Sequence, residues 1–290
     1  MNESFKAKRL RITITIDDGA GIASQMIFTD HAMQVSVQKQ GAPELPKAHV
    51  SIYGLSERQM AQLTMLSFDA LSLRRNVIEI AAGDAGGELS VVFQGEIMQA
   101  APDMNAAPSP VMQIEAITAA YPKLTPLGPY AVSGEQSVDS LMGSFAEQAS
   151  MTYAGYGVST SLKDCVISGD PISKAEWVAS TIGADLVLDG QEMSLVMPGS
   201  AIGEAVPLSQ AEIINPETGE IGYPSFDSMG IQVTCLFRPE LRVAGLMRIS
   251  SGMPRATGLW KIYSVAHDLA ANCPSGGPWR TTAAGTWMEA

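Results

Sequence analysis

Apolar and polar residues alternate along both ends of the chain. The clearest case is residues 9–16, where one Leu and three Ile alternate with Arg and Thr. Because successive side chains of a strand point to opposite faces of a sheet, this pattern predicts a half-buried β-strand. The alternation returns at 33–37 and, after a Gly-Ala-Pro break, at 48–53. The N-terminal third is therefore predicted to be an antiparallel β structure.

The period changes after this third strand. Ser56 and Gln59 have the spacing of a capping box, and Leu55 and Met60 occupy the two positions of a hydrophobic staple. These signals predict a short helix over residues 57–66. Strand patterns then return in three stretches that predict a hairpin and a further strand, at residues 76–82, 88–100 and 108–119.

The C-terminal part again consists of short strand-forming runs with turn residues between them. Ile231, Val233 and Cys235 alternate with polar residues in the first run, and proline at 239 ends it. Runs at this spacing are typical of an antiparallel barrel or sandwich. The predicted strands are residues 230–237, 243–250, 258–267 and 278–287.

Helical periodicity is strongest in the middle of the chain, after a proline-rich stretch at 121–129. Ser137 is predicted to cap one helix. Ser173 and Glu176 have the spacing of a capping box, and Ile172 and Trp177 have the spacing of a hydrophobic staple. A second helix is therefore predicted to begin at Ser173 and to end at Gly183. A hairpin over 185–188 and 193–197 follows. The prediction is an N-terminal β-barrel domain (1–121), an α+β insert (122–205) and a C-terminal β-barrel domain (206–290).

The order of residues in the C-terminal part resembles a known family. The motifs are Gly222-Tyr-Pro, Leu236-Phe-Arg-Pro-Glu-Leu-Arg-Val-Ala-Gly, Gly258-Leu-Trp-Lys-Ile-Tyr-Ser-Val-Ala-His and Pro274-Ser-Gly-Gly-Pro-Trp-Arg-Thr. They are similar to the C-terminal barrel of baseplate hub proteins of contractile-tailed phages, which are related to the hub part of type VI secretion VgrG spike proteins. The family usually has Asn where Arg238 stands.

The resemblance implies a mainly β protein with two tail-tube-like barrels flanking a small α+β domain. It also implies a homotrimer that joins a sixfold tail tube to a threefold central spike, contacts neighbouring baseplate proteins and lines a channel through which DNA passes. The expected location is the virion tail. Arg74, Arg75, Arg238 and Arg242 are candidate interface residues that face acidic patches of neighbouring subunits; the alternative is that they are solvated surface charges.

Charge and cysteine content agree with this picture. The net charge is −12, which disfavours sequence-independent nucleic-acid binding but lets DNA pass a channel without adhering. Residues 122–205 carry 3 Lys and Arg against 10 Asp and Glu, more than half of the net charge. Three widely spaced cysteines form neither a disulfide framework nor a zinc pattern, and no apolar run predicts a signal peptide or membrane insertion. Synthesis in a host cytoplasm is expected.

Reactive motifs are weak. Gly19 and Gly21 follow a strand, but the residues after them lack the third Gly, the helix and the acidic residue of a dinucleotide loop, so a turn is predicted. The histidines lack metal-site spacing, and a nucleophile pair of Cys235 or Cys273 with His267 stays open. The prediction is no enzyme, no cofactor and no metal. The alternatives are a cell-wall hydrolase or peptidase of a tail tip, and a carbohydrate-binding receptor module.

Overall fold

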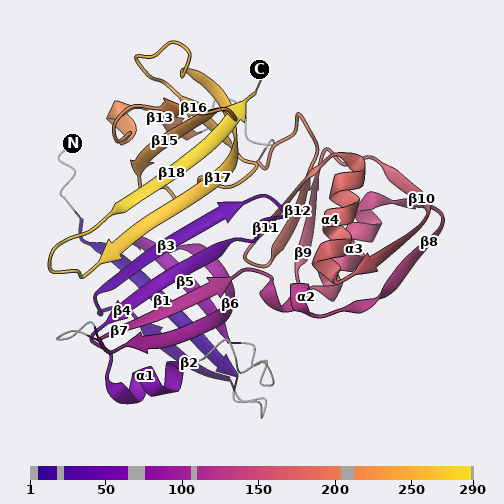
Figure 1. Cartoon of the computed structure of the whole chain (residues 1–290). Helices are drawn as coiled ribbons and strands as arrows, with labels where there is room; N and C mark the ends of the chain where they lie inside the picture. Colours follow the sequence, from indigo (N-terminus) through magenta and orange to yellow (C-terminus); the bar gives the residue numbers. More distant parts are fainter. Residues whose placement is uncertain (1–5, 18–22, 65–75, 106–109, 204–211, 289–290) are drawn as a thin grey trace. The chain divides into compact units, whose positions relative to one another are not determined.

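The computed structural model describes residues 6–17, 23–64, 76–105, 110–203 and 212–288. The secondary structure is mainly β, in large antiparallel sheets with few helices (Figure 1). The chain divides into two compact units. Unit 1 comprises Met1–Val37, Lys47–Thr118 and His267–Arg280, and unit 2 comprises Gln38–Pro46, Ala119–Ala266 and Thr281–Ala290. The division into 1–121, 122–205 and 206–290 stays a prediction.

Unit 1 is built on an antiparallel sheet with the strand order β3-β4-β7-β6-β5-β1-β2. The strands are β1 (Lys8–Asp17), β2 (Ala23–Phe28), β3 (Met33–Gln40), β4 (Lys47–Tyr53), β5 (Val77–Asp84), β6 (Ser90–Asp103) and β7 (Val111–Ile117), and the last residues of β3 belong to unit 2. All the predicted N-terminal strands are confirmed, within a few residues at their ends.

The alternation in β1 has the predicted structural effect. Leu10, Ile12 and Ile14 are fully buried, whereas Arg9 on the opposite face is exposed. Strand β1 pairs with β5 along Lys8–Thr15, but β2 pairs with β1 only from Ile12 onward. The first four residues of β1 therefore have a strand neighbour on one side only, within the ranges that the structure describes.

Helix α1 (Glu57–Leu63) confirms the predicted helix. The Ser56 side chain accepts a hydrogen bond from the Gln59 backbone N–H, and the Gln59 side chain accepts one from the Ser56 N–H, which is the reciprocal pair of a capping box. Met60 and Leu63 are buried. The predicted end near residue 66 is wrong, because the helix ends at Leu63 and Thr64 is its C-cap with an extended backbone.

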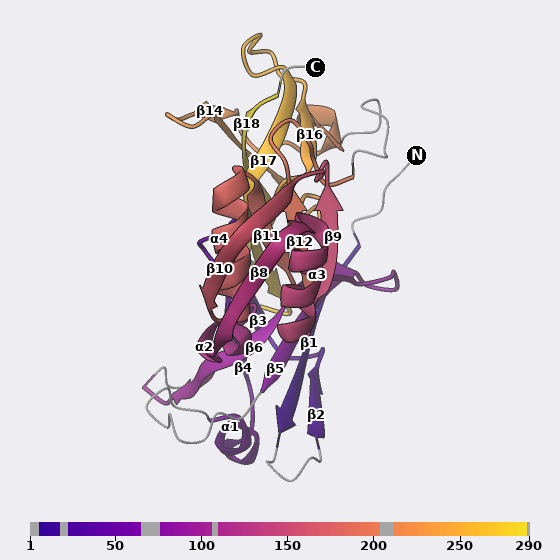
Figure 2. The same cartoon turned by 90° about the vertical axis from the view of Figure 1, so that its right-hand side faces the viewer.

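The insert part of unit 2 packs two helices between two β layers (Figures 1 and 2). One layer is the β11-β12-β9 sheet, in which β9 is parallel to β12, and the other is the β8-β10 ribbon. The elements are α2 (Ala120–Leu124), β8 (Leu127–Ser137), α3 (Val138–Gln148), β9 (Thr152–Tyr156), β10 (Ser161–Gly169), α4 (Pro171–Ile182), β11 (Asp185–Asp189) and β12 (Glu192–Val196). Apolar residues of both helices and both layers form one core, centred on Phe145.

Three local predictions for the insert have clear outcomes. Ser137 caps α3 and Gly183, with a positive φ of 70°, ends α4, as predicted. The prediction that α4 begins at Ser173 is wrong. Asp170 is the N-cap, because its side chain accepts the Ser173 backbone N–H and Pro171 occupies the first turn, where its missing N–H costs nothing.

The C-terminal strands of unit 2 enclose a second core around Trp260, Val233 and Met247. Their order is β14-β15-β18-β17, with β16 pairing to β17 and β13 pairing to β16. The elements are β13 (Glu212–Ile214), the 3₁₀ turn η2 (Pro216–Thr218), β14 (Ser225–Phe226), β15 (Ile231–Leu236), β16 (Leu246–Ile249), β17 (Gly258–Ala271) and β18 (Trp279–Trp287). The four predicted strands are confirmed. Strand β13 and the two-residue β14 were not predicted.

Candidate interaction surfaces

No group of three or more His, Cys, Asp and Glu in the described part of the chain could hold a metal ion. No described helix is long and apolar enough to span a bilayer. The turn predicted at Gly19 and Gly21 lies outside the described residues, but the segment after it forms strand β2 rather than a helix, which removes the structural context of a dinucleotide loop.

The cysteines named above lie in structural positions. Cys235 is fully buried in the core of the C-terminal strands, where a thiol behaves as a small hydrophobe. Cys273 is half-buried, and its Sγ lies 3.6 Å from the backbone carbonyl oxygens of Met33 and Ala271. His267 is buried and has a polar or aromatic partner. The Cys235 thiol is therefore shielded from solvent, whereas Cys273 is partly exposed.

Unit 2 contains a pocket of about 660 Å³. Its wall combines the turn after β3, the face of α4 that carries Glu176, strand β11 and residues Lys261–Tyr263 of β17. Lys261 Nζ lies 2.8 Å from a carboxylate oxygen of Asp185 within this wall. Burial raises the pKa of Tyr263, and its hydroxyl donates to Asp227, which adds to the shift. Apolar residues form most of the pocket lining, and the Asp185 and Lys261 side chains in it are paired with each other.

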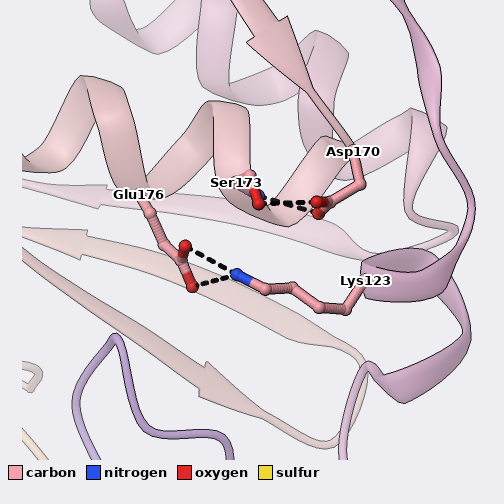
Figure 3. Close-up of polar contacts among 4 residues, drawn as sticks. All are labelled: Lys123, Asp170, Ser173 and Glu176. Carbon is pink, nitrogen blue, oxygen red and sulfur yellow. Dashed lines mark hydrogen bonds and ion pairs between the residues drawn. The ribbon is translucent and has the colours of Figure 1, made fainter.

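Glu176 at the pocket wall is paired as well (Figure 3). The Lys123 ammonium, from α2, lies 2.6 Å from both carboxylate oxygens of Glu176. At the N-cap of α4, the Asp170 carboxylate accepts hydrogen bonds from the backbone N–H and the hydroxyl of Ser173. The Lys123–Glu176 pair joins α4 to α2, whereas the Asp170 contacts cap the first turn of α4, so both carboxylates have structural partners.

The four predicted interface arginines divide into two groups. Arg74 and Arg75 lie outside the described residues. Arg238 is half-buried, and its Nη2 donates to the carbonyl oxygen of Thr218 at 2.7 Å. Arg242 is exposed and borders a small recess with Asp189 and Glu192. Arg238 therefore has a role within its own chain, and the interface role of all four residues stays a prediction.

Exposed apolar side chains gather along one border of the sheet, at β14. We call the segment Gly219–Phe226, which runs antiparallel to β15, the β14 edge. Tyr223 is 83% exposed, and Ile221 and Phe226 are about half exposed. Large exposed side chains of this kind, particularly aromatic ones, are enriched where proteins meet partners.

The β14 edge is not a regular strand. Glu220 is opposite Cys235, whereas Ser225 is opposite Gln232, so the edge advances five residues while β15 advances three. The two extra residues form a bulge around Gly222, which has a φ of 79°, and Pro224, which has no N–H to donate. The bulge projects Tyr223 outward and makes the edge unsuitable for extending a continuous ladder.

Glu220 is the unusual polar residue of this edge. Directly opposed residues of an antiparallel pair share a face, so its side chain lies on the same side of the sheet as the fully buried Cys235. The Oε1 atom is buried and has no hydrogen-bond partner among the described residues. Burial raises the pKa of the Glu220 carboxyl above its ordinary value. A carboxylate in this position needs a cation or a donor that the described chain does not supply.

The comparisons with known proteins concern the fold. No family model matches the sequence, and no curated protein matches it. Solved structures do: the chain has the fold of phage tail proteins. It is similar to the tail protein from Neisseria meningitidis MC58, with a TM-score of 0.64, 9% identity, and coverage of 95% of this chain and 96% of that one.

Two further structures extend the likeness. The 43 kDa tail protein of prophage MuSo2 from Shewanella oneidensis has a TM-score of 0.62 at 8% identity, and the match covers 95% of this chain and 96% of that one. A chain of the Francisella PdpA–VgrG complex has a TM-score of 0.58 at 6% identity, with 97% of this chain and 58% of that chain covered. The predicted resemblance to hub-type tail and VgrG proteins is confirmed at the level of the fold.

Sequence reasoning did not find the β14 edge as a surface. The Gly222-Tyr-Pro motif was noted only as the start of the C-terminal strands, and Glu220 was one acid among many in an acidic chain. A bulge signal was present, because Gly and Pro interrupt the alternation two residues apart. The burial of the Glu220 carboxylate could not be found this way, because it depends on which strand lies opposite.

Proposed function

We propose that this protein is a structural component of a phage-type tail, at the baseplate hub. The observation that carries the proposal is the shared fold with two tail proteins over 95% of this chain, with nearly the whole of each of those chains matched. The likeness to VgrG favours the central hub over other tail positions. The expected location is the virion tail.

The mechanism is symmetry adaptation. Three copies form a ring, and in each copy the strands of residues 1–121 and 206–290 make two tube-like barrels that flank the insert at 122–205. Six barrel-like modules then match a sixfold tail tube, while the threefold ring receives a central spike. Strand-rich modules suit this role because their edges can be covered by neighbouring subunits. Neighbouring baseplate proteins are further partners.

Charge supports a role in DNA passage. A net charge of −12 repels phosphate, so the walls of a central channel would not retain DNA. The Arg74, Arg75, Arg238 and Arg242 side chains are proposed to contact acidic surfaces of adjacent subunits, which this composition supplies in excess. The function is therefore one of assembly, without a catalytic step or a cofactor.

Imaging the assembled tail by electron microscopy tests the proposal. We expect density for three copies of this chain around the tail axis, between the tube and the spike. Density at the tail periphery, or in any number other than three, would reject the hub assignment. Peptidoglycan clearing by the purified protein in a zymogram would favour the alternative, a tail-tip cell-wall hydrolase or peptidase.

A further inference from the structure

Two strand borders of opposite charge are left uncovered in the described part of the chain. One is the β14 edge, with the buried, unpartnered Oε1 of Glu220 beside the exposed Ile221 and Tyr223. The other is the start of β1, residues Lys8–Arg11, which we call the β1 edge. It pairs with β5 on one side, and β2 begins to cover its other side only at Ile12.

The β1 edge offers an unused cation. Lys8 Nζ lies 2.7 Å from an Asp84 carboxylate oxygen, and Arg11 Nη2 lies 3.6 Å from one of Glu79. Arg9, between them, is opposite Gly83, which has no side chain, and forms no ion pair with a described residue. An exposed guanidinium of this kind is suited to bidentate pairing with a carboxylate.

We propose that the β14 edge of one copy docks against the β1 edge of the next copy, with Arg9 as the cation for Glu220. This inference rests on the homotrimer of the proposed function and names the contact that builds it. Each copy uses each edge once, so the interface is heterologous, and such an interface closes into a ring when the rotation between copies allows it.

A second copy fits both edges better than a different partner does. A separate spike or tube protein on the β14 edge would leave the β1 edge and Arg9 unpaired, whereas head-to-tail docking covers both. The bulge at Pro224 prevents a continuous ladder, so side chains carry the contact. Tyr223, in the bulge, packs against the docked copy and excludes water around the ion pair, which strengthens it relative to a solvated pair.

Neutral substitutions test each partner. Sedimentation of the purified full chain over a concentration series measures the trimer dissociation constant. Glu220→Gln and Arg9→Gln are each expected to weaken association by about ten- to hundredfold, as for close charge pairs in other interfaces. Glu217→Gln and Arg255→Gln are the matched controls, because both residues are exposed and lie outside the two edges; they should change association by less than about twofold. Circular dichroism confirms that each variant is folded.

A charge exchange tests the pairing itself. Glu220→Arg and Arg9→Glu should each abolish the trimer, and the two together in one chain should restore it, because every interface then again holds one cation and one anion. No recovery in the double variant, or neutral variants that associate like their controls, overturns the Arg9–Glu220 contact while leaving the trimer intact. A wild-type chain that stays monomeric up to its solubility limit overturns the contact and the homotrimer together.

Discussion

Gly95 in the interior of β6 is predicted to tolerate no side chain. A Cβ at this position would lie 2.8 Å from both the carbonyl carbon and the carbonyl oxygen of Ile117, and 2.8 Å from Cζ of Phe93. These distances are roughly 0.7 Å shorter than the ~3.5 Å at which carbon atoms pack favourably. Ile117 is paired with Glu96 in the β6–β7 ladder, so relief requires the two strands to separate.

The magnitude follows from two opposing effects. Overpacking a well-filled site costs up to about 3 kcal/mol, and the backbone position of the Ile117 atoms favours the upper end. Replacing Gly by Ala also lowers the conformational entropy of the unfolded chain, which raises the free energy of unfolding by about 0.4–1 kcal/mol. The net expectation for Gly95→Ala is a loss of about 2 kcal/mol, or a melting temperature lower by about 4–8 °C.

The control is the same chemical change at Gly143 in α3, where no atom lies within 4 Å of an added Cβ. Gly143→Ala should stabilise by about 0.5–1 kcal/mol, because Gly weakens a helix interior. Thermal unfolding by circular dichroism gives the sign, and hydrogen exchange should locate the lost protection in β5–β7. Equal melting temperatures for Gly95→Ala and wild type would refute the packing argument.

Three further predictions concern unit 2. Asp170→Ala should destabilise α4 by about 1 kcal/mol and Ser173→Ala by clearly less, measured by hydrogen exchange of α4, because Asp170 is the N-cap; a larger effect at Ser173 would contradict this. Lys123→Met and Glu176→Gln should show a coupling of about 1 kcal/mol in a double-mutant cycle of urea unfolding, since the pair is partly solvated; zero coupling would mean that the ion pair contributes nothing. The folded-state pKa of Glu220 is raised, so its contribution to stability is present below its unfolded-state pKa and is lost as pH rises through the folded-state value. In the monomeric chain, at concentrations below the trimer dissociation constant, Glu220→Gln should therefore raise the free energy of unfolding at about pH 7 and lose this advantage below about pH 4, in urea titrations at the two pH values; an advantage independent of pH would contradict the assignment.

Local patterns predicted the elements whose cause is local. The alternation in residues 9–16 predicted strand β1, because every second side chain there is a large aliphatic group whose transfer out of water is favourable. The capping box at Ser56 and the end of α4 at Gly183 were also predictable from the sequence, because each depends on atoms only a few residues apart. The start of α4 was misplaced because Asp170 and Ser173 both have capping side chains, and only the backbone geometry selects Asp170.

The sequence alone determined that this is a mainly β protein with a helical insert, and that its C-terminal part resembles a tail hub. Only the tertiary structure decided which edges stay uncovered and which charges stay unpaired. The pairing of β2 with β1 stops at Ile12, which lies opposite Phe28, and Glu220 lies opposite Cys235, so these contacts join residues 16 and 15 positions apart in the sequence. Hydrophobic periodicity reports which face of a strand is buried, but the partner of each strand is set by packing of the whole chain, and that choice buries one carboxylate oxygen of Glu220.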